Sequence, residues 1–250
     1  MEIIQVYQTK NPSYTRNRSI TPVGVFVHST GANNRNLKRY VDAEERLGKN
    51  QYNNHWNKAD VNKSVHAFIG LDKDQKVIVA QTLPYDRACW GAGSGTKGSY
   101  NYDPQAHLQF EICQGSDTDS DYYWKAITVA EEYCAHLCKL YGWDVDKITS
   151  HAEAHKKGYA SNHADPISWM KKFDDNMDKF RERVAKRLGS VPSQEQKSEY
   201  TLYTIKNGDS LWNIALRHLG AGIRYKEIMQ LNGLKSTVIY AGKQLKIPKG

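Results

Sequence analysis

Apolar and polar positions alternate along the first 190 residues in a pattern typical of strands and helices. Four short apolar runs predict buried strands: VGVFVHS (23–29), SVHAFIGL (64–71), KVIVAQTL (76–83) and HLQFEIC (107–113). The middle two flank a polar turn and predict a β-hairpin. Across residues 121–142 apolar side chains recur every three or four positions, which predicts a long helix ending at Gly142. Strands interleaved with helices indicate an α/β domain, with a mixed central sheet flanked by helices.

A change of composition near residue 190 divides the chain. Residues 171–188 predict an amphipathic helix, since apolar side chains follow at intervals of three and four: Phe173, Met177, Phe180, Val184 and Leu188. The stretch GSVPSQEQKSE (189–199) contains one apolar residue among Gly, Pro, Ser and Gln, which is typical of a linker. Residues 200–250 then predict a small βααβ module. We expect a domain at 1–188, a linker at 189–199 and a second domain at 200–250.

The composition is that of a folded protein, with 39% hydrophobic and 25% charged residues. No segment approaches the roughly 18 consecutive apolar residues that a membrane span needs. The first residues lack a basic start followed by an apolar core, so we expect no secretory signal peptide and synthesis in the cytoplasm.

The net charge of +8 favours an anionic partner, such as nucleic acid, an acidic membrane surface or the acidic polymers of a bacterial wall. Lysines and arginines are dispersed and no segment resembles a DNA-reading helix, so nucleic acid is not expected. Four cysteines are too few and too scattered for a disulfide scaffold. Cys134 and Cys138 share a helical face with apolar residues, which predicts burial rather than a metal pair.

The C-terminal module resembles the lysin motif (LysM) in three stretches, YTIKNGDSLWNIA, EIMQLNGL and IYAGKQLKIP. The resemblance covers about residues 201–248 and implies binding of polysaccharide that contains N-acetylglucosamine, such as peptidoglycan or chitin. In this family the sugar lies between the loop after the first strand and the loop after the second helix. The corresponding residues are Gly208, Asp209, Ser210, Leu211, Asn232, Gly233 and Leu234. For each of them a role in a turn or in the core is the alternative.

A stretch rich in histidine, SHAEAHKKGYASNHADP (150–166), is a candidate for metal binding. Its HAEAH pair could hold zinc from a helix, but it is not the HExxH of metalloproteases, and no long helical pattern supports it. His28 ends an apolar strand, where a polar group needs a partner. A catalytic zinc typically takes three protein ligands and leaves one position open. His28, His151 and Asp165 could supply two imidazoles and a carboxylate.

Residues 20–175 resemble the zinc-dependent N-acetylmuramoyl-L-alanine amidases, a group that includes phage endolysins and peptidoglycan recognition proteins. The resemblance rests on VGVFVHSTGANN, SVHAFIGLDKD, LPYDRACWGAG, LQFEICQG and SHAEAHKKGYASNHADPISW. It implies that zinc is held by His28, His151 and Asp165. It also implies Glu111 as general base and His163, where some branches have lysine, as the donor to the oxyanion. His155 gains no role as a ligand and is expected to be structural or exposed.

The resemblance implies an enzyme that cuts the bond between N-acetylmuramic acid and L-alanine in peptidoglycan, as a phage or prophage endolysin that acts on the wall after release. The alternatives are a non-catalytic peptidoglycan-recognition protein and a zinc peptidase that cuts the stem peptide. The complete ligand set favours the amidase. His66 and Trp90 are candidates for contact with substrate, with core packing as the alternative for each; many relatives have histidine where this chain has Gly91.

Overall fold

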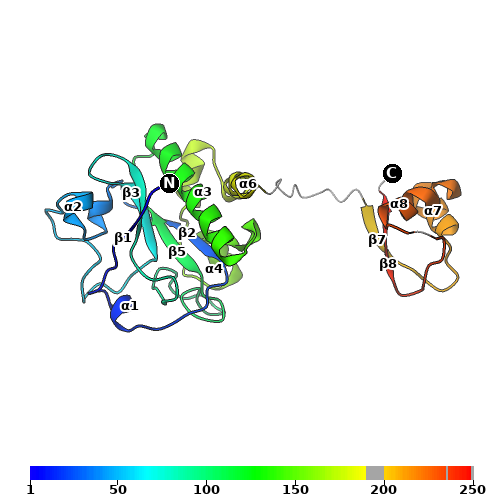
Figure 1. Cartoon of the computed structure of the whole chain (residues 1–250), viewed down its shortest axis with the longest axis horizontal. Coiled ribbons are helices and arrows are strands. Elements are labelled where there is room, and N and C mark those ends of the chain that lie inside the picture. Colours follow the sequence, from blue (N-terminus) through cyan, green and yellow to red (C-terminus); the bar gives the residue numbers. More distant parts are fainter. Residues whose placement is uncertain (190–199, 235, 249–250) are drawn as a thin grey trace. The chain divides into compact units, whose positions relative to one another are not determined.

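The structure is a computed structural model, and it describes residues 1–189, 200–234 and 236–248. The chain divides into two compact units, residues 1–192 and 193–250 (Figure 1). Apart from Gly189, the linker predicted at 189–199 lies outside the described residues. Within the described residues, no helix combines the length and the apolar character that crossing a membrane requires.

A six-stranded sheet forms the centre of the first unit. Its strands lie in the order β1 (Ile3–Gln5), β4 (Val77–Gln81), β3 (Ala67–Leu71), β5 (Leu108–Ile112), β2 (Val25–Ser29) and β6 (Ile148–Ser150). Strands β3 and β4 pair antiparallel as the predicted hairpin, and the other pairs are parallel. The four predicted strands are thus confirmed. Strands β1 and β6 were not predicted, because they have three residues each and are too short to show a period.

Two helices, α3 (Ser120–Tyr141) and α6 (Met177–Leu188), contribute to the core on one face of the sheet. Figure 1 shows α3 lying across the strands. Strand residues at alternate positions pack in this core, among them Val25, Val27, Phe110 and Ile112. Helix α3 ends at Gly142, whose φ of 68° favours glycine, so the predicted helix is confirmed. Cys134 and Cys138 lie in the same core, unpaired, as predicted.

The predicted helix at 171–188 is shorter than the periodicity indicated. Residues Lys171–Phe173 form a separate 3-10 turn, and Asp174 adopts a left-handed conformation with φ of 51°. The side chain of Asn176 then accepts hydrogen bonds from the backbone of Asp178 and Lys179 and starts α6 at Met177. The prediction of one helix from 171 was wrong because this cap competes with a continuous helix.

Short elements complete the first unit. They are α1 (Pro12–Thr15), α2 (Glu44–Leu47), α4 (His151–Lys157) and α5 (Ile167–Met170), with 3-10 turns at Leu37–Arg39 and Val145–Lys147. The other face of the sheet presents Phe26, His28, Phe68 and Glu111, because side chains alternate along a strand. The candidate site therefore lies on the face opposite the α3 core.

The second unit is the predicted βααβ module. An antiparallel pair, β7 (Tyr200–Thr204) and β8 (Gln244–Pro248), accompanies α7 (Leu211–Leu219), a 3-10 turn at Gly222–Arg224 and α8 (Tyr225–Leu231). Its own buried core contains residues of α7, α8 and β8, together with Ile205: Leu211, Ile214, Ala215, Leu219, Ile228, Leu245 and Ile247.

Candidate metal centre

His28 and Glu111 are neighbours because the register of two parallel strands places them side by side. His28 on β2 is the direct partner of Glu111 on β5, and adjacent strands lie about 4.8 Å apart. Phe110 and Ile112, on either side of Glu111, point into the α3 core. The alternation of the strand therefore turns the single acidic residue of this run towards the histidine.

His151 is brought to His28 by the short helix α4, which the sequence analysis did not expect. Strand β6 pairs with β2 and ends at Ser150, so His151 is the first residue of the helix. Ser150 and Glu153 form a capping box: Ser150 Oγ accepts from the Glu153 backbone at 3.3 Å, and Glu153 Oε2 accepts from the Ser150 backbone at 2.9 Å. Gly158, with φ of 89°, ends the helix. The Ser-x-x-Glu spacing was the signal that could have revealed it.

We expect the Ser150→Ala variant to lose about 1 kcal/mol of stability, because an N-cap serine supports the first turn of the helix. For a domain of this size that corresponds to a fall of about 2–4 °C in the unfolding temperature. Thermal unfolding in the presence of a chelator would measure the effect without a contribution from metal. Ser168→Ala, the same change at an exposed position, is the control. An equal shift in both variants would contradict a special role for the cap.

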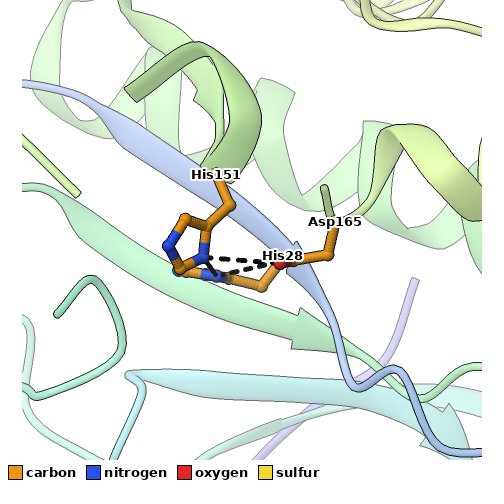
Figure 2. A group of neighbouring side chains, drawn as sticks. All are labelled: His28, His151 and Asp165. Atoms are coloured by element: carbon orange, nitrogen blue, oxygen red, sulfur yellow. Dashed lines mark hydrogen bonds and ion pairs between the residues drawn. The ribbon is translucent and has the colours of Figure 1, made fainter. Parts of the chain in front are cut away.

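Three atoms of His28, His151 and Asp165 converge on one point (Figure 2). The two Nδ1 atoms are 3.1 Å apart. Asp165 Oδ2 lies 3.2 Å from His28 Nδ1, and Asp165 Oδ1 lies 3.4 Å from His151 Nδ1. Both histidines are buried, and 19% of the Asp165 side chain is exposed. The structure thus brings together the three residues that the sequence analysis nominated as ligands.

This donor set fits a zinc ion. Ligand atoms at about 2.0–2.1 Å from a tetrahedral zinc are about 3.3–3.4 Å from one another. The two Nδ1 atoms are 3.1 Å apart, close to this separation, and one ligand atom from each of the three residues lies within 4.8 Å of the others. The far nitrogens face acceptors: His28 Nε2 lies 3.3 Å from Gln109 Oε1, and His151 Nε2 lies 3.3 Å from Ser161 Oγ. With the protons on Nε2, both Nδ1 lone pairs meet beside a carboxylate, an arrangement that a cation stabilises. Neither Gln109 nor Ser161 was predicted, since a tertiary contact leaves no periodic signal in the sequence.

The two carboxyl groups at the site have opposite pKa shifts. Burial raises the pKa of Asp165, but hydrogen bonds and charge from His151 and His28 outweigh it, so its pKa lies well below the usual value. It can serve as an anionic ligand. Burial raises the pKa of Glu111 well above its usual value, and the nearby Asp165 raises it further. Glu111 Oε2 is buried and has no hydrogen-bond partner among the described residues.

The other two histidines of the 150–166 stretch lie at different places. His163 is exposed, and its Nδ1 lies 3.0 Å from Ser161 Oγ and 3.3 Å from His151 Nε2. It is therefore next to a candidate ligand, at the rim of the site. His155 is exposed at the end of α4, with Nδ1 3.2 Å from the carbonyl of Ala160, and does not belong to the converging group.

His66 and Trp90 differ in burial and in the contacts that their side chains already make. Both nitrogens of His66 are engaged: Nδ1 accepts from the Gln109 backbone at 3.0 Å and Nε2 donates to the Arg87 carbonyl at 2.9 Å. With 1% of the residue exposed, this environment favours core packing over contact with substrate. Trp90 is half-buried, and the Arg16 guanidinium lies 4.4 Å from its ring. One face of the indole thus has a partner already.

In the LysM module most of the nominated side chains make internal contacts. Asp209 accepts from the Tyr203 hydroxyl at 2.7 Å and the Lys206 backbone at 2.8 Å, and these hydrogen bonds lower its pKa to about 2. Ser210 caps α7, and Leu211 is buried. These contacts give the three side chains structural roles, which leaves their backbone as the part that could line a groove.

The nominated residues after α8 follow the same pattern. Asn232 donates to the carbonyls of Ile228 and Lys246 and accepts from the Lys246 backbone at 2.8 Å. Gly233 adopts φ of 62°, and Leu234 packs partly buried against the module's core. Asn232 therefore ties α8 to β8, and the turn at Gly233 requires its positive φ.

Comparisons with known proteins agree with the two units. A family model described as N-acetylmuramoyl-L-alanine amidase matches residues 18–168, and one described as LysM domain matches residues 203–248. The N-acetylmuramoyl-L-alanine amidase XlyB of Bacillus subtilis is 28% identical over 192 residues, which cover 75% of this chain and 55% of XlyB. The amidase sle1 of Staphylococcus epidermidis is 41% identical over 68 residues, 27% of this chain and 20% of sle1. The chain thus spans about half of the first relative and a fifth of the second.

Solved structures share the fold. Staphylococcus aureus hydrolase AmiA, solved in complex with its ligand, gives a TM-score of 0.55 at 21% identity and covers 77% of this chain and 87% of its own. The catalytic domain of XlyA gives 0.50 at 21% identity, with 74% and 99% covered. The amidase model matches more than half of the residues. The chain therefore belongs to the N-acetylmuramoyl-L-alanine amidase family and carries a LysM domain after its amidase domain.

Proposed function

We propose that this chain is a zinc-dependent amidase that hydrolyses the bond between N-acetylmuramic acid and L-alanine in peptidoglycan. The observation that carries the proposal is the convergence of His28, His151 and Asp165 close to Glu111, whose Oε2 has no hydrogen-bond partner in the described part of the chain. Two imidazoles and one carboxylate form a donor set that leaves a fourth zinc position open.

The residues divide the chemistry among them. His28, His151 and Asp165 would hold zinc, which when bound polarises an amide carbonyl and lowers the pKa of its water to about 7. Glu111 would accept the proton of the attacking water and pass it to the departing amine of L-alanine. His163, at the rim of the site, would donate a hydrogen bond to the oxyanion, a contribution of about 2.7–4 kcal/mol for such donors elsewhere.

The domain division we propose is a catalytic domain at 1–188, a linker at 189–199 and a wall-binding domain at 200–250. A second module that binds the same polymer raises the effective concentration of substrate without adding contacts at the catalytic site. The net charge of +8 would add attraction to anionic wall polymers, which weakens as salt rises.

We expect a protein truncated after Gly189 to bind insoluble peptidoglycan at least tenfold more weakly, while its hydrolysis of a small soluble muropeptide stays unchanged. The reason is that avidity is lost but the catalytic residues remain. Co-sedimentation and a soluble-substrate assay would separate the two effects. Equal retention of both proteins on the wall would argue against a targeting role for LysM.

The biological setting of the proposal is that of an endolysin. It rests on the resemblance of the sequence to phage lysins. Such an enzyme would be synthesised in the cytoplasm and act on the bacterial wall after release.

Mass spectrometry of digested peptidoglycan tests the proposed bond. Free stem peptides with N-terminal L-alanine, absent when a chelator is added, are the expected products. Peptides cut between two amino acids would instead identify a zinc peptidase. Intact peptidoglycan that still binds the protein would identify a recognition protein without catalysis.

A further inference from the structure

We propose that residues 91–93 position both histidine ligands of the metal site, by holding a partner against the far ring nitrogen of each. The partners are Gln109 for His28 and Ser161 for His151. The inference rests on the proposed zinc site and concerns positioning residues, which act on the metal through its ligands.

The first arm runs through Gln109, a fully buried residue of β5. Its Nε2 donates to the Tyr100 carbonyl at 3.2 Å and to Asn101 Oδ1 at 3.0 Å. A carbonyl can only accept, so the amide must present Oε1 to His28 Nε2, 3.3 Å away. Asn101 is oriented in turn by the backbone N–H of Ala92, which donates to its Oδ1 at 3.0 Å.

Gly91 supplies the space that this amide occupies. A Cβ at this position would lie 2.5 Å from Gln109 Oε1 and 3.1 Å from Val65 Cγ1. The φ of Gly91 is not positive, so the turn itself does not require glycine. What requires it is the close approach of the Gln109 amide. Any larger side chain here would displace the Gln109 amide from its place.

The second arm runs through Ser161. Its backbone N–H donates to the Ala92 carbonyl at 2.9 Å and its Oγ donates to the same oxygen at 3.2 Å. The Oγ has two lone pairs, so it can accept from His151 Nε2, 3.3 Å away, even with His163 Nδ1 at 3.0 Å from the same oxygen. A Cβ on Gly93 would lie 2.5 Å from Ser161 Oγ, and its φ of +64° also favours glycine. Residues 91–93 thus contact the residues that support His28 and His151.

These contacts determine which nitrogen of each ring can bind a metal. An acceptor at Nε2 keeps the proton there and leaves the Nδ1 lone pair of His28 and of His151 directed at the common point. Loss of a partner of this kind typically lowers metal affinity by about 10–100-fold. Residues 91–93 therefore influence the metal affinity of the site through the partners of its two histidine ligands.

The test measures zinc affinity of the full chain by competition with a chromophoric chelator. We expect Gln109→Ala and Gly91→Ala each to weaken zinc binding by about 10–100-fold. The double variant should bind no more weakly than Gln109→Ala alone, because Gly91 acts only through the Gln109 amide. Gln109→Glu keeps an acceptor for His28 Nε2 but places an oxygen where the amide nitrogen donates to the Tyr100 carbonyl and Asn101 Oδ1, so it should recover part of the affinity that Gln109→Ala loses.

The matched control is Gln81→Ala on β4, a buried glutamine whose Nε2 donates to the Leu83 carbonyl at 3.2 Å. It should keep the zinc affinity of wild type even if the unfolding temperature falls. Thermal unfolding with a chelator present identifies a variant that fails to fold, and Gln109→Met, which fills more of the space, then takes its place. Folded Gln109 and Gly91 variants with wild-type affinity would overturn the proposal, as would an equal loss in Gln81→Ala. A wild-type chain that binds no zinc would instead contradict the proposed metal site.

Discussion

Replacing Glu111 by glutamine is expected to lower the rate of peptidoglycan hydrolysis by about 10²–10⁴-fold, the usual contribution of a general acid–base group. Glutamine keeps the size of the side chain but cannot take a proton. The measurement is the release of peptides with N-terminal L-alanine from purified peptidoglycan. Zinc affinity should change little, since Glu111 is not one of the three converging groups.

The same variant should be at least as resistant to heat as wild type. Burial and the charge of Asp165 disfavour the ionised form of Glu111, and both raise its pKa, so a neutral amide removes an unfavourable charge from the folded state. A protein that is inactive yet no less stable is the pattern expected of a functional group. Glu182→Gln, on α6, is the control, and it should match wild type in activity. Turnover of Glu111→Gln within threefold of wild type would exclude Glu111 as the proton acceptor.

Replacing His151 by alanine is expected to abolish zinc binding at micromolar concentration and to lower hydrolysis about a thousand-fold or more, because bound zinc supplies several kcal/mol of transition-state stabilisation. A chelator should give wild type the same deficit, and added zinc should reverse it. Zinc should also stabilise the folded chain by about 2.7 kcal/mol at 100 times its dissociation constant. That stabilisation should be absent from His151→Ala.

His155 provides the matched control, because it is the same residue type four positions further along the same helix. It is exposed and lies outside the converging group. His155→Ala should retain zinc affinity, activity and the stabilisation by zinc. If both histidine variants lost zinc equally, the pair would form a different site from the one proposed.

The elements that could be predicted were those long enough to show a hydrophobic period in the sequence. The apolar residues of strand β2 and of helix α3 are themselves enough to predict these elements, and the structure agrees with the prediction there. Strands β1 and β6 have three residues each and exist because β4 and β2 pair with them. Helix α4 depends on a capping box rather than on an apolar face, which is why its amphipathic pattern was not visible.

Residue chemistry nominated His28, His151 and Asp165 as possible ligands, and the family resemblance was needed to assign roles to Glu111 and His163. His28 lies 123 residues from His151 and 137 from Asp165, separations at which local spacing carries no information. The supporting residues Gln109 and Ser161 were missed for a related reason. A buried glutamine on a strand and a serine in a loop acquire their roles from what the fold places opposite them.

The four buried cysteines bear on where this fold can be stable. None is paired, so the folded state owes nothing to disulfide formation. Burial raises the pKa of the thiols, Cys138 to about 11, and thiolates are the form that reacts with oxidants. The chain can therefore fold under reducing conditions and keep the same structure under oxidising ones. The proposed endolysin, synthesised in the cytoplasm and acting on the wall, would therefore keep its structure in both environments.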